Sequence, residues 1–316
     1  MKKLLQSIIF FLFLLLLLGG GYLLYLSQGL PDPSNFSHRV VAQSTKIYDR
    51  TGKILLYEIH KGEKRRVLSQ KEDISPYVFA TTLAAEDHTF YQHHGFVIKS
   101  IFRALIHNLL HPHDLQGGST ITQQLARNAF LTLDKSLNRK LKEAILTIEI
   151  EKRYSKDEIL LMYLNQVHYG HNVYGIEAAA EFYFNKSARD LSLAESAYLA
   201  ALLKAPNYLS PYGNHRQELE QRKNWILRRL QELHYYPPSV IQKAMAQKVV
   251  FAVPSFGIKA PHFVMYVRDQ LYKQFGKEEL EEGGYIVITT LDMRLQNLAE
   301  ELVHKYGDFN EKKIGA

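Results

Sequence analysis

Residues 86–95 read EDHTFYQHHG and residues 117–127 read GGSTITQQLAR, and these two stretches decide how the chain is interpreted. The first closes an apolar run with two carboxylates and three imidazoles, a composition suited to proton transfer. The second is a glycine-rich entry to a helix with Ser119 or Thr120 as N-cap, and the free N–H groups of a helix start can receive an anion. Taken alone, each stretch is equally typical of an ordinary helix terminus, so the surrounding sequence has to decide.

A basic helix is predicted shortly after them, over about Ser136 to Tyr154. Arg139, Lys140 and Glu143 are spaced three and four residues apart within it, so they share one face with the carboxylate between two cations. In isolation such a group is an ordinary surface salt bridge that stabilises by roughly 0–1 kcal/mol. Its meaning therefore depends on its neighbours in the chain.

The rest of the chain is mainly helical by pattern. Helical periodicity extends from residue 74 to about 234, with capping boxes that begin at Ser155 and Ser192. Before it, residues 45–58 alternate around a glycine-containing turn and predict a β-hairpin. After it, residues 283–290 are rich in β-branched side chains and predict a strand in a small α/β C-terminal segment. We expect four parts, which are residues 1–27, residues 28–73, residues 74–234 and residues 235–316.

The N-terminal part has the features of a membrane anchor. Residues 4–26 are almost wholly apolar and uncharged, and about 20 such residues cross a bilayer as a helix. Lys2 and Lys3 predict that the N-terminus stays inside and that the remainder is exported. A cleaved signal peptide is the alternative, but its apolar core is typically only about 7–15 residues long. We therefore expect an uncleaved, single-pass transmembrane helix.

Composition restricts the function only loosely. Hydrophobic residues make up 46% and charged residues 22% of the chain, as in ordinary globular proteins. The absence of cysteine excludes disulfides and thiolate metal sites. The formal charge of +7 favours anionic partners such as nucleic acid, anionic lipid or a phosphorylated substrate, without choosing among them.

Five sequence motifs occur in an order that resembles glycosyltransferase family 51, the peptidoglycan glycosyltransferase domain of class A penicillin-binding proteins. The resemblance covers about Ile74 to Leu230. The motifs are residues 86–95, 117–124, 139–143, 159–165 and 222–227. Leu161 stands where the family usually has an acidic residue, and Arg127 where it more often has lysine. No Ser-x-x-Lys or Lys-Thr-Gly sequence occurs, so the family's transpeptidase is missing and residues 235–316 resemble only the start of that region.

The resemblance implies a lysozyme-like helical domain, partly embedded in the membrane beside the anchor, that polymerises lipid II. In this reaction a sugar hydroxyl displaces undecaprenyl pyrophosphate with inversion. Glu86 is then the general base, and Glu143 is a second catalytic carboxylate that orients cations or holds a divalent ion such as Mg²⁺ or Mn²⁺. No cofactor is required by the sequence itself. The implied substrate-binding residues are Asp87, Phe90, His93, Ser119, Thr120, Gln123, Gln124, Arg127, Lys135, Arg139 and Lys140.

Two other functions fit parts of the pattern. A lysozyme-like hydrolase also uses a glutamate acid in a glycan-binding cleft, but it has no need of a cationic site for pyrophosphate. An inactive anchored scaffold would not need the catalytic motifs. We therefore expect a transferase in the bacterial cytoplasmic membrane, with its catalytic domain outside. Its expected partners are lipid II, the growing glycan chain, the membrane and cell-wall synthesis proteins, and not nucleic acid. The sequence leaves open whether the chain is a piece of a longer protein.

Overall fold

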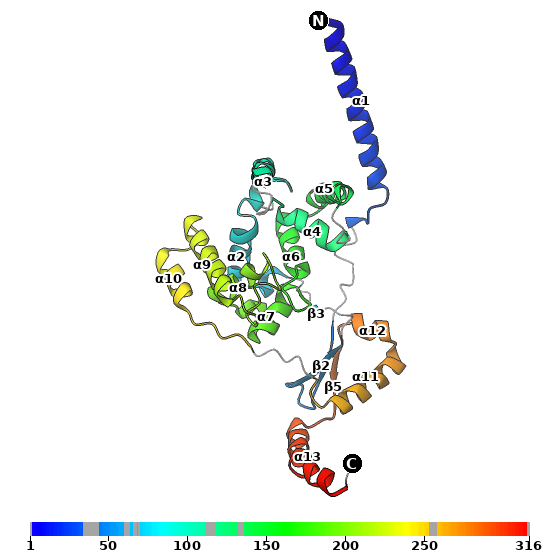
Figure 1. The fold of residues 1–316 in the computed structure, drawn as a ribbon, viewed down its shortest axis with the longest axis vertical. Helices are drawn as coiled ribbons and strands as arrows, with labels where there is room; N and C mark the ends of the chain where they lie inside the picture. The colour runs from blue at the N-terminus through cyan, green and yellow to red at the C-terminus, as the bar shows by residue number, and fades with distance from the viewer. Residues whose placement is uncertain are drawn as a thin grey trace.

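The computed structural model describes residues 2–33, 44–59, 64–65, 68, 70–110, 118–131, 136–252 and 258–314, and it is mainly helical (Figure 1). The helices of the central body are α2 (Pro76–Glu86), α3 (Ile98–Leu110), α4 (Ile121–Phe130), α5 (Leu137–Arg153), α6 (Lys156–Gln166), α7 (Ile176–Phe184), α8 (Leu193–Leu202), α9 (Arg216–Glu232) and α10 (Pro238–Ala246). Short 3₁₀ turns lie at Lys71–Asp73, Phe90–Gln92 and Ala188–Asp190. The predicted mainly α fold is confirmed.

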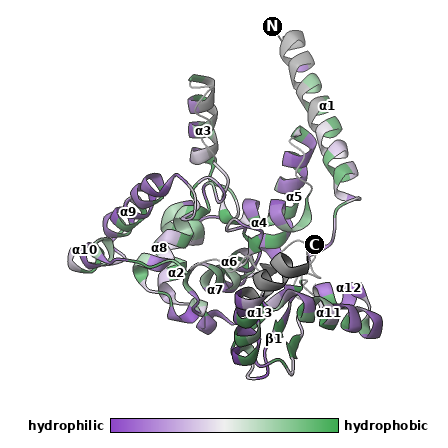
Figure 2. Cartoon of the chain, turned by 60° about the horizontal axis from the view of Figure 1, so that its bottom comes forward, coloured by the Kyte–Doolittle hydropathy of each residue, from purple (hydrophilic) through white to green (hydrophobic). Residues whose placement is uncertain are grey.

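The core of this body is built around α8. Its sequence is apolar or small except for Glu195, and all of its residues are buried. Ser192 and Glu195 close the predicted capping box at its start, which satisfies N–H groups that have no partner inside the helix. The helix packs against both α2 and α9, and Figure 2 shows the hydrophilic colour on α9 at the periphery. The apolar faces of the surrounding helices therefore point inward and fix the position of α2, which carries Glu86.

A small α/β unit lies apart from the helical body (Figure 1). The predicted hairpin is confirmed, because β1 (Thr45–Tyr48) pairs antiparallel with β2 (Leu55–Ile59). The carboxylate of Asp49 holds the turn by accepting hydrogen bonds from the backbone N–H groups of Thr51 and Ile54. The other side of β1 pairs in parallel with β5 (Ile286–Ile288).

Segments from near the two ends of the chain thus share one sheet, with strand order β2-β1-β5. The helices of this unit are α11 (Pro261–Phe275), α12 (Lys277–Glu282) and α13 (Met293–Ile314). Its core contains Ile47 and Leu56 from the hairpin together with Val264 and Met293 from the C-terminal segment. The hairpin is therefore not an isolated addition before the helical domain. A second, two-stranded sheet joins β3 (Lys64–Arg65) to β4 (Val173–Tyr174) within the helical body.

The predicted anchor segment forms the helix α1 (Lys2–Ser27), which rises beside α5 (Figure 1). The hydroxyl of Tyr22 donates to Oδ1 of Asn138 on α5 at 2.8 Å, and Arg153 ion-pairs with Asp32 at 2.7 Å. Among the residues that the structure describes, no helix combines the length and the apolar character needed to cross a bilayer.

Candidate active site

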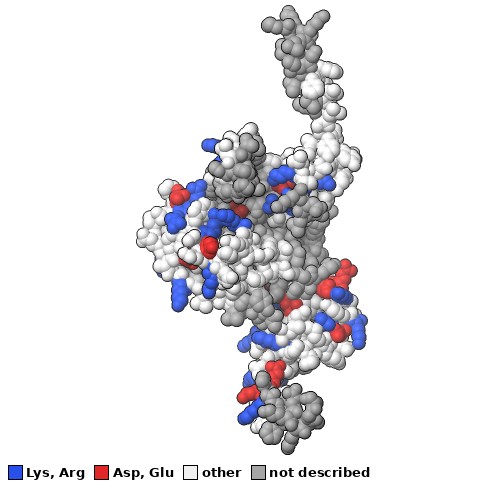
Figure 3. Space-filling model, in the orientation of Figure 1, with Lys and Arg blue, Asp and Glu red and all other residues white. Residues whose placement is uncertain are grey.

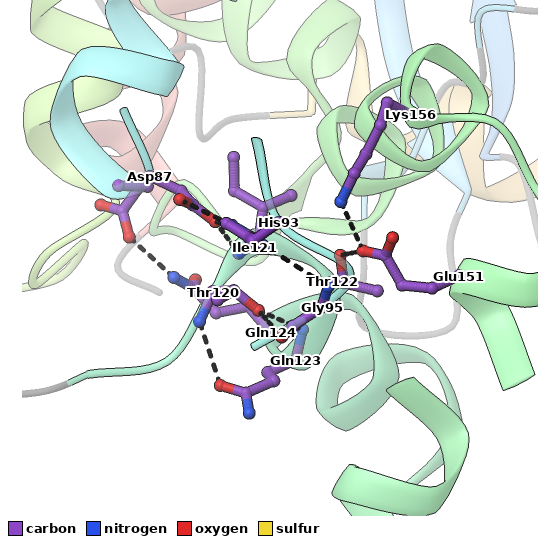
Figure 4. Close-up of polar contacts among 11 residues, drawn as sticks. Asp87, His93, Gly95, Thr120, Ile121, Thr122, Gln123, Gln124, Glu151 and Lys156 are labelled. Carbon is purple, nitrogen blue, oxygen red and sulfur yellow. Dashed lines mark hydrogen bonds and ion pairs between the residues drawn. The ribbon is translucent and has the colours of Figure 1, made fainter. Parts of the chain in front are cut away.

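Glu86 is the last residue of α2, and Asp87 holds this helix end in place. Asp87 leaves the helix with extended φ of −160°, and its buried carboxylate accepts hydrogen bonds from Nε2 of His93 at 3.0 Å and from the backbone N–H of Ile121 at 3.2 Å (Figure 4). Ile121 is the first residue of α4. The first and second motifs are thereby bound to each other, with Asp87 and His93 in internal contacts.

Thr120 is the N-cap of α4, and Gln123 completes a capping box with it. The hydroxyl of Thr120 also donates to the carbonyl oxygen of Gly95 at 2.7 Å (Figure 4). Gly95 has φ of +83°, and a Cβ at this position would lie 2.5 Å from the methyl group of Thr147 on α5. The polar groups of Thr120 and Gln123 are therefore used in building the helix entry, and glycine is needed where this loop crosses α5.

The environment of Glu86 favours a carboxyl group that can take up a proton. Nε2 of Gln124 donates to Oε2 of Glu86 at 2.8 Å. Burial raises the pKa of Glu86, while the Gln124 hydrogen bond and the positive charges of Arg222 and Arg127 lower it; the net pKa lies above its ordinary value. A carboxylate with a raised pKa is a better base at neutral pH than an exposed one.

Glu143 lies in a different environment, on α5. Its side chain is fully buried and ion-pairs with Lys140 and with Arg139, whose NH1 lies 3.8 Å from Oε2 of Glu143. Nζ of Lys140 also donates to the hydroxyl of Ser119 at 3.2 Å. The predicted arrangement of one carboxylate between two cations is confirmed, and the second and third motifs meet through Lys140 and Ser119.

Two polar atoms in this cluster are buried without a hydrogen-bond partner, namely Oε2 of Glu143 and Nε of Arg139. Lys140, in contrast, has a half-exposed side chain. A buried polar atom without a partner is costly unless something else satisfies it. The half-exposed ammonium group of Lys140 is therefore the cation of this cluster that an anion from solvent can reach.

The remaining predicted site residues differ in their surroundings. Phe90 is fully buried and has Nζ of Lys156 4.4 Å from the centre of its ring, so it packs in the core. Arg127 is half-buried in the last turn of α4. Lys135 lies outside the described residues. Within the described ranges, no group of three His, Asp or Glu side chains is placed to hold a metal ion.

Two residues that the sequence did not assign to the site lie around Glu86. Arg222, from the fifth motif, acts electrostatically on Glu86 and stacks on Trp225, with its Cζ 4.2 Å from the ring centre. Tyr163, from the fourth motif, donates its hydroxyl hydrogen to Oε1 of Gln124 at 3.2 Å. The sequence motifs that contain them do not predict this position, because nothing in a local pattern shows that α6 and α9 reach α2.

Comparison with known proteins identifies the family of this chain. The family model described as Transglycosylase matches residues 52–231. The chain is 38% identical to penicillin-binding protein 1A of Rickettsia felis, over 90% of this chain and 36% of that protein. It is 38% identical to penicillin-binding protein 1A of Pseudomonas aeruginosa, over 90% and 34%, and 40% identical to penicillin-binding protein 2D of Bacillus subtilis, over 83% and 38%. It thus spans little more than a third of the length of these relatives. Because the family model covers both carboxylate clusters and more than half of the sequence, the chain belongs to the transglycosylase family.

Proposed function

We propose that this chain is a peptidoglycan glycosyltransferase that polymerises lipid II into β-1,4-linked glycan strands and releases undecaprenyl pyrophosphate. The observation that supports this most strongly is that the site contains two glutamates in different surroundings. Glu86 has a raised pKa and a neutral hydrogen-bond donor, whereas Glu143 holds a cation cluster. A transferase with a pyrophosphate leaving group requires both a base and a cationic site, and here α4 connects the two, because Gln124 on α4 binds Glu86 and α4 packs against α5.

In the proposed reaction, the 4-hydroxyl oxygen of the acceptor sugar attacks the anomeric carbon of the lipid-linked donor. Glu86 takes the hydroxyl proton as the new C–O bond forms, a contribution of about 10²–10⁴-fold for a positioned base. The bond from the anomeric carbon to the pyrophosphate oxygen breaks with its electron pair. Arg127, Arg139 and Lys140 then meet the negative charge that develops on the pyrophosphate, so they stabilise the transition state more than the ground state.

Glu143 is proposed to position these cations. Its buried carboxylate fixes Arg139 and Lys140 on one face of α5. It already pairs with two cations, and the part of the chain that the structure describes offers no three-ligand cluster for a metal ion. A divalent ion, if required, would be held mainly by the oxygens of the substrate pyrophosphate, which is the usual mode of Mg²⁺ binding.

The surface near the cation cluster supports the proposal that this domain associates with the membrane. Ile98, Phe102, Ile106 and Leu110 are all exposed on α3 and follow one another every four residues, so they form an apolar stripe on one side of that helix. α1 rises on the same side of the molecule (Figure 1). On the face drawn in Figure 3 the Lys and Arg side chains are dispersed among acidic ones, so the positive charge does not form one continuous basic surface.

The proposed membrane association, with α1 as an anchor and the N-terminus inside, is tested by adding protease to intact spheroplasts. Digestion of the part beyond α1 is the expected result. Complete protection of that part while the membrane stays sealed would contradict the orientation.

The activity is tested by incubating the purified chain with lipid II and analysing the products. Polymer with release of undecaprenyl pyrophosphate is the expected result. Cleavage of preformed glycan without polymer formation would indicate a hydrolase, and lipid II binding without turnover would indicate an inactive scaffold. A labelled penicillin should form no covalent adduct with the 316-residue chain, because no transpeptidase motif occurs in it.

A further inference from the structure

Behind Glu86 a chain of two hydrogen bonds connects three helices. Oε2 of Glu86, at the end of α2, accepts from Nε2 of Gln124 on α4 at 2.8 Å. Oε1 of the same Gln124 accepts from the hydroxyl of Tyr163 on α6 at 3.2 Å. Tyr163 is fully buried, and α4 packs directly against α6.

The orientation of the Gln124 amide matters because its two ends have nearly the same shape and opposite hydrogen-bonding character. With Nε2 toward Glu86 it donates to the carboxylate, and with Oε1 toward Glu86 it would place two acceptors against each other. Tyr163 favours the first state, because its hydroxyl donates to the oxygen end. If the amide turned round, the hydroxyl could accept from the NH₂ group, but its own hydrogen would lose the acceptor that it has in the described contacts. Burial raises the pKa of Tyr163 well above its ordinary value, so this hydroxyl keeps its proton at any pH at which the enzyme works.

We propose that Tyr163 is a positioning residue that locks the Gln124 amide so that it always donates to Glu86, which holds the general base in its ionised form. This inference rests on the proposed function for its catalytic meaning, whereas the lock itself is a property of the structure. Tyr163 does not touch the reacting atoms in this scheme. It acts through Gln124.

The other groups that act on Glu86 come from several elements. Arg222 on α9 and Arg127 on α4 favour its charged form, while Asp87 disfavours it. Tyr163 and Tyr169 are both buried and both respond to the charge of Glu86. Of these contacts in the described part of the chain, the bond from Gln124 is the direct hydrogen bond to the carboxylate, so its loss should move the titration of Glu86 to higher pH.

The test compares Tyr163→Phe with the matched control Tyr183→Phe. Tyr183 is also fully buried, and its hydroxyl donates to the backbone oxygen of Tyr169 at 2.7 Å. Both variants thus lose one buried tyrosine hydroxyl, but only Tyr163→Phe frees the amide. We expect the acid limb of the kcat–pH profile to move up by about 0.5–1 pH unit in Tyr163→Phe only, the value of one net hydrogen bond. KM for lipid II should stay unchanged, and the rates should converge at high pH.

A second measurement does not depend on turnover. The carboxyl ¹³C signal of Glu86, assigned by its absence in Glu86→Gln, should titrate at higher pH in Tyr163→Phe than in Tyr183→Phe. If Tyr163→Phe does not fold, Gln124→Met removes the donor itself and should show the same shift. Equal titration of Glu86 in these variants and the control would overturn the lock. If Tyr163→Phe shows the ¹³C shift but the wild-type chain does not polymerise lipid II, the proposed function is refuted while the lock stands.

Discussion

The two glutamates of the site, Glu86 and Glu143, have the same side chain in opposite surroundings. Glu86 terminates α2 and accepts a hydrogen bond from a neutral amide, with Arg222 and Arg127 acting on it only through space. Glu143 lies inside α5, where Lys140 and Arg139 contact it directly. Burial raises the pKa of Glu86, which makes it able to accept a proton. Glu143 instead holds two cations in ion pairs. The comparison supports proton transfer as the role of Glu86 and positioning of the two cations as the role of Glu143.

The largest expected effect is that of Glu86→Gln. The amide cannot accept the hydroxyl proton, so kcat for lipid II polymerisation should fall by about 10²–10⁴-fold. Binding of lipid II should be nearly intact, because the cation cluster on α5 is not altered. Turnover and binding measured on the same preparation test both statements. Polymerisation at a near wild-type rate would remove Glu86 from its role.

Gly95→Ala should lower stability, because Gly95 lies where the loop after Glu86 crosses α5, the helix that carries Glu143. The new methyl group would lie 2.5 Å from Thr147 on α5, and the backbone has positive φ. We expect a loss of about 2–4 kcal/mol in the free energy of unfolding, the sum of backbone strain and steric overlap.

The matched control for this substitution is Gly276→Ala. Gly276 has φ of +87° and open space around it, so it carries the backbone strain without the overlap. Thermal unfolding of both variants should show the larger decrease for Gly95→Ala. Equal decreases would mean that the loop does not press against α5.

Glu143→Gln should be milder than Glu86→Gln and of a different kind. Loss of the carboxylate frees Arg139 and Lys140, so inhibition by undecaprenyl pyrophosphate should weaken by about tenfold, which corresponds to about 1.4 kcal/mol. The response to magnesium concentration should also change. The division of roles would fail if added metal restored Glu86→Gln but never Glu143→Gln.

These results show what the sequence can and cannot predict. The basic helix was predicted from Ser136 to Tyr154, and the structure has α5 over Leu137–Arg153 with these two residues as caps. Helix spacing and capping are local, so the Arg139–Lys140–Glu143 face followed from the sequence directly.

The pairing of β1 with β5 did not follow from the sequence, because it joins Lys46 to Ile286 across most of the chain. The approach of Arg222 and Tyr163 to Glu86 depends on the same kind of long-range packing. A local pattern can show that such residues are charged or aromatic, but it cannot show which helix they will face.

The smallest expected effect, that of Arg222→Gln, tests whether Glu86 is tuned through space. Arg222 lies on α9, and its positive charge lowers the pKa of Glu86. Without this charge the pKa of Glu86 should rise further above its ordinary value, so a higher pH is needed to ionise the base. The acid limb of the kcat–pH profile should therefore move to higher pH, by less than about one unit because the charge of Arg222 affects the pKa of Glu86 less than burial and the Gln124 hydrogen bond do. Arg228→Gln is the control. Arg228 is exposed on the same helix, and its substitution removes the same net charge. A shift in Arg222→Gln alone, with inhibition by undecaprenyl pyrophosphate unchanged, would show that Glu86 is tuned independently of the cation cluster at Glu143. An equal shift in both variants would mean that the net charge of the protein, and not the position of Arg222, acts on the base.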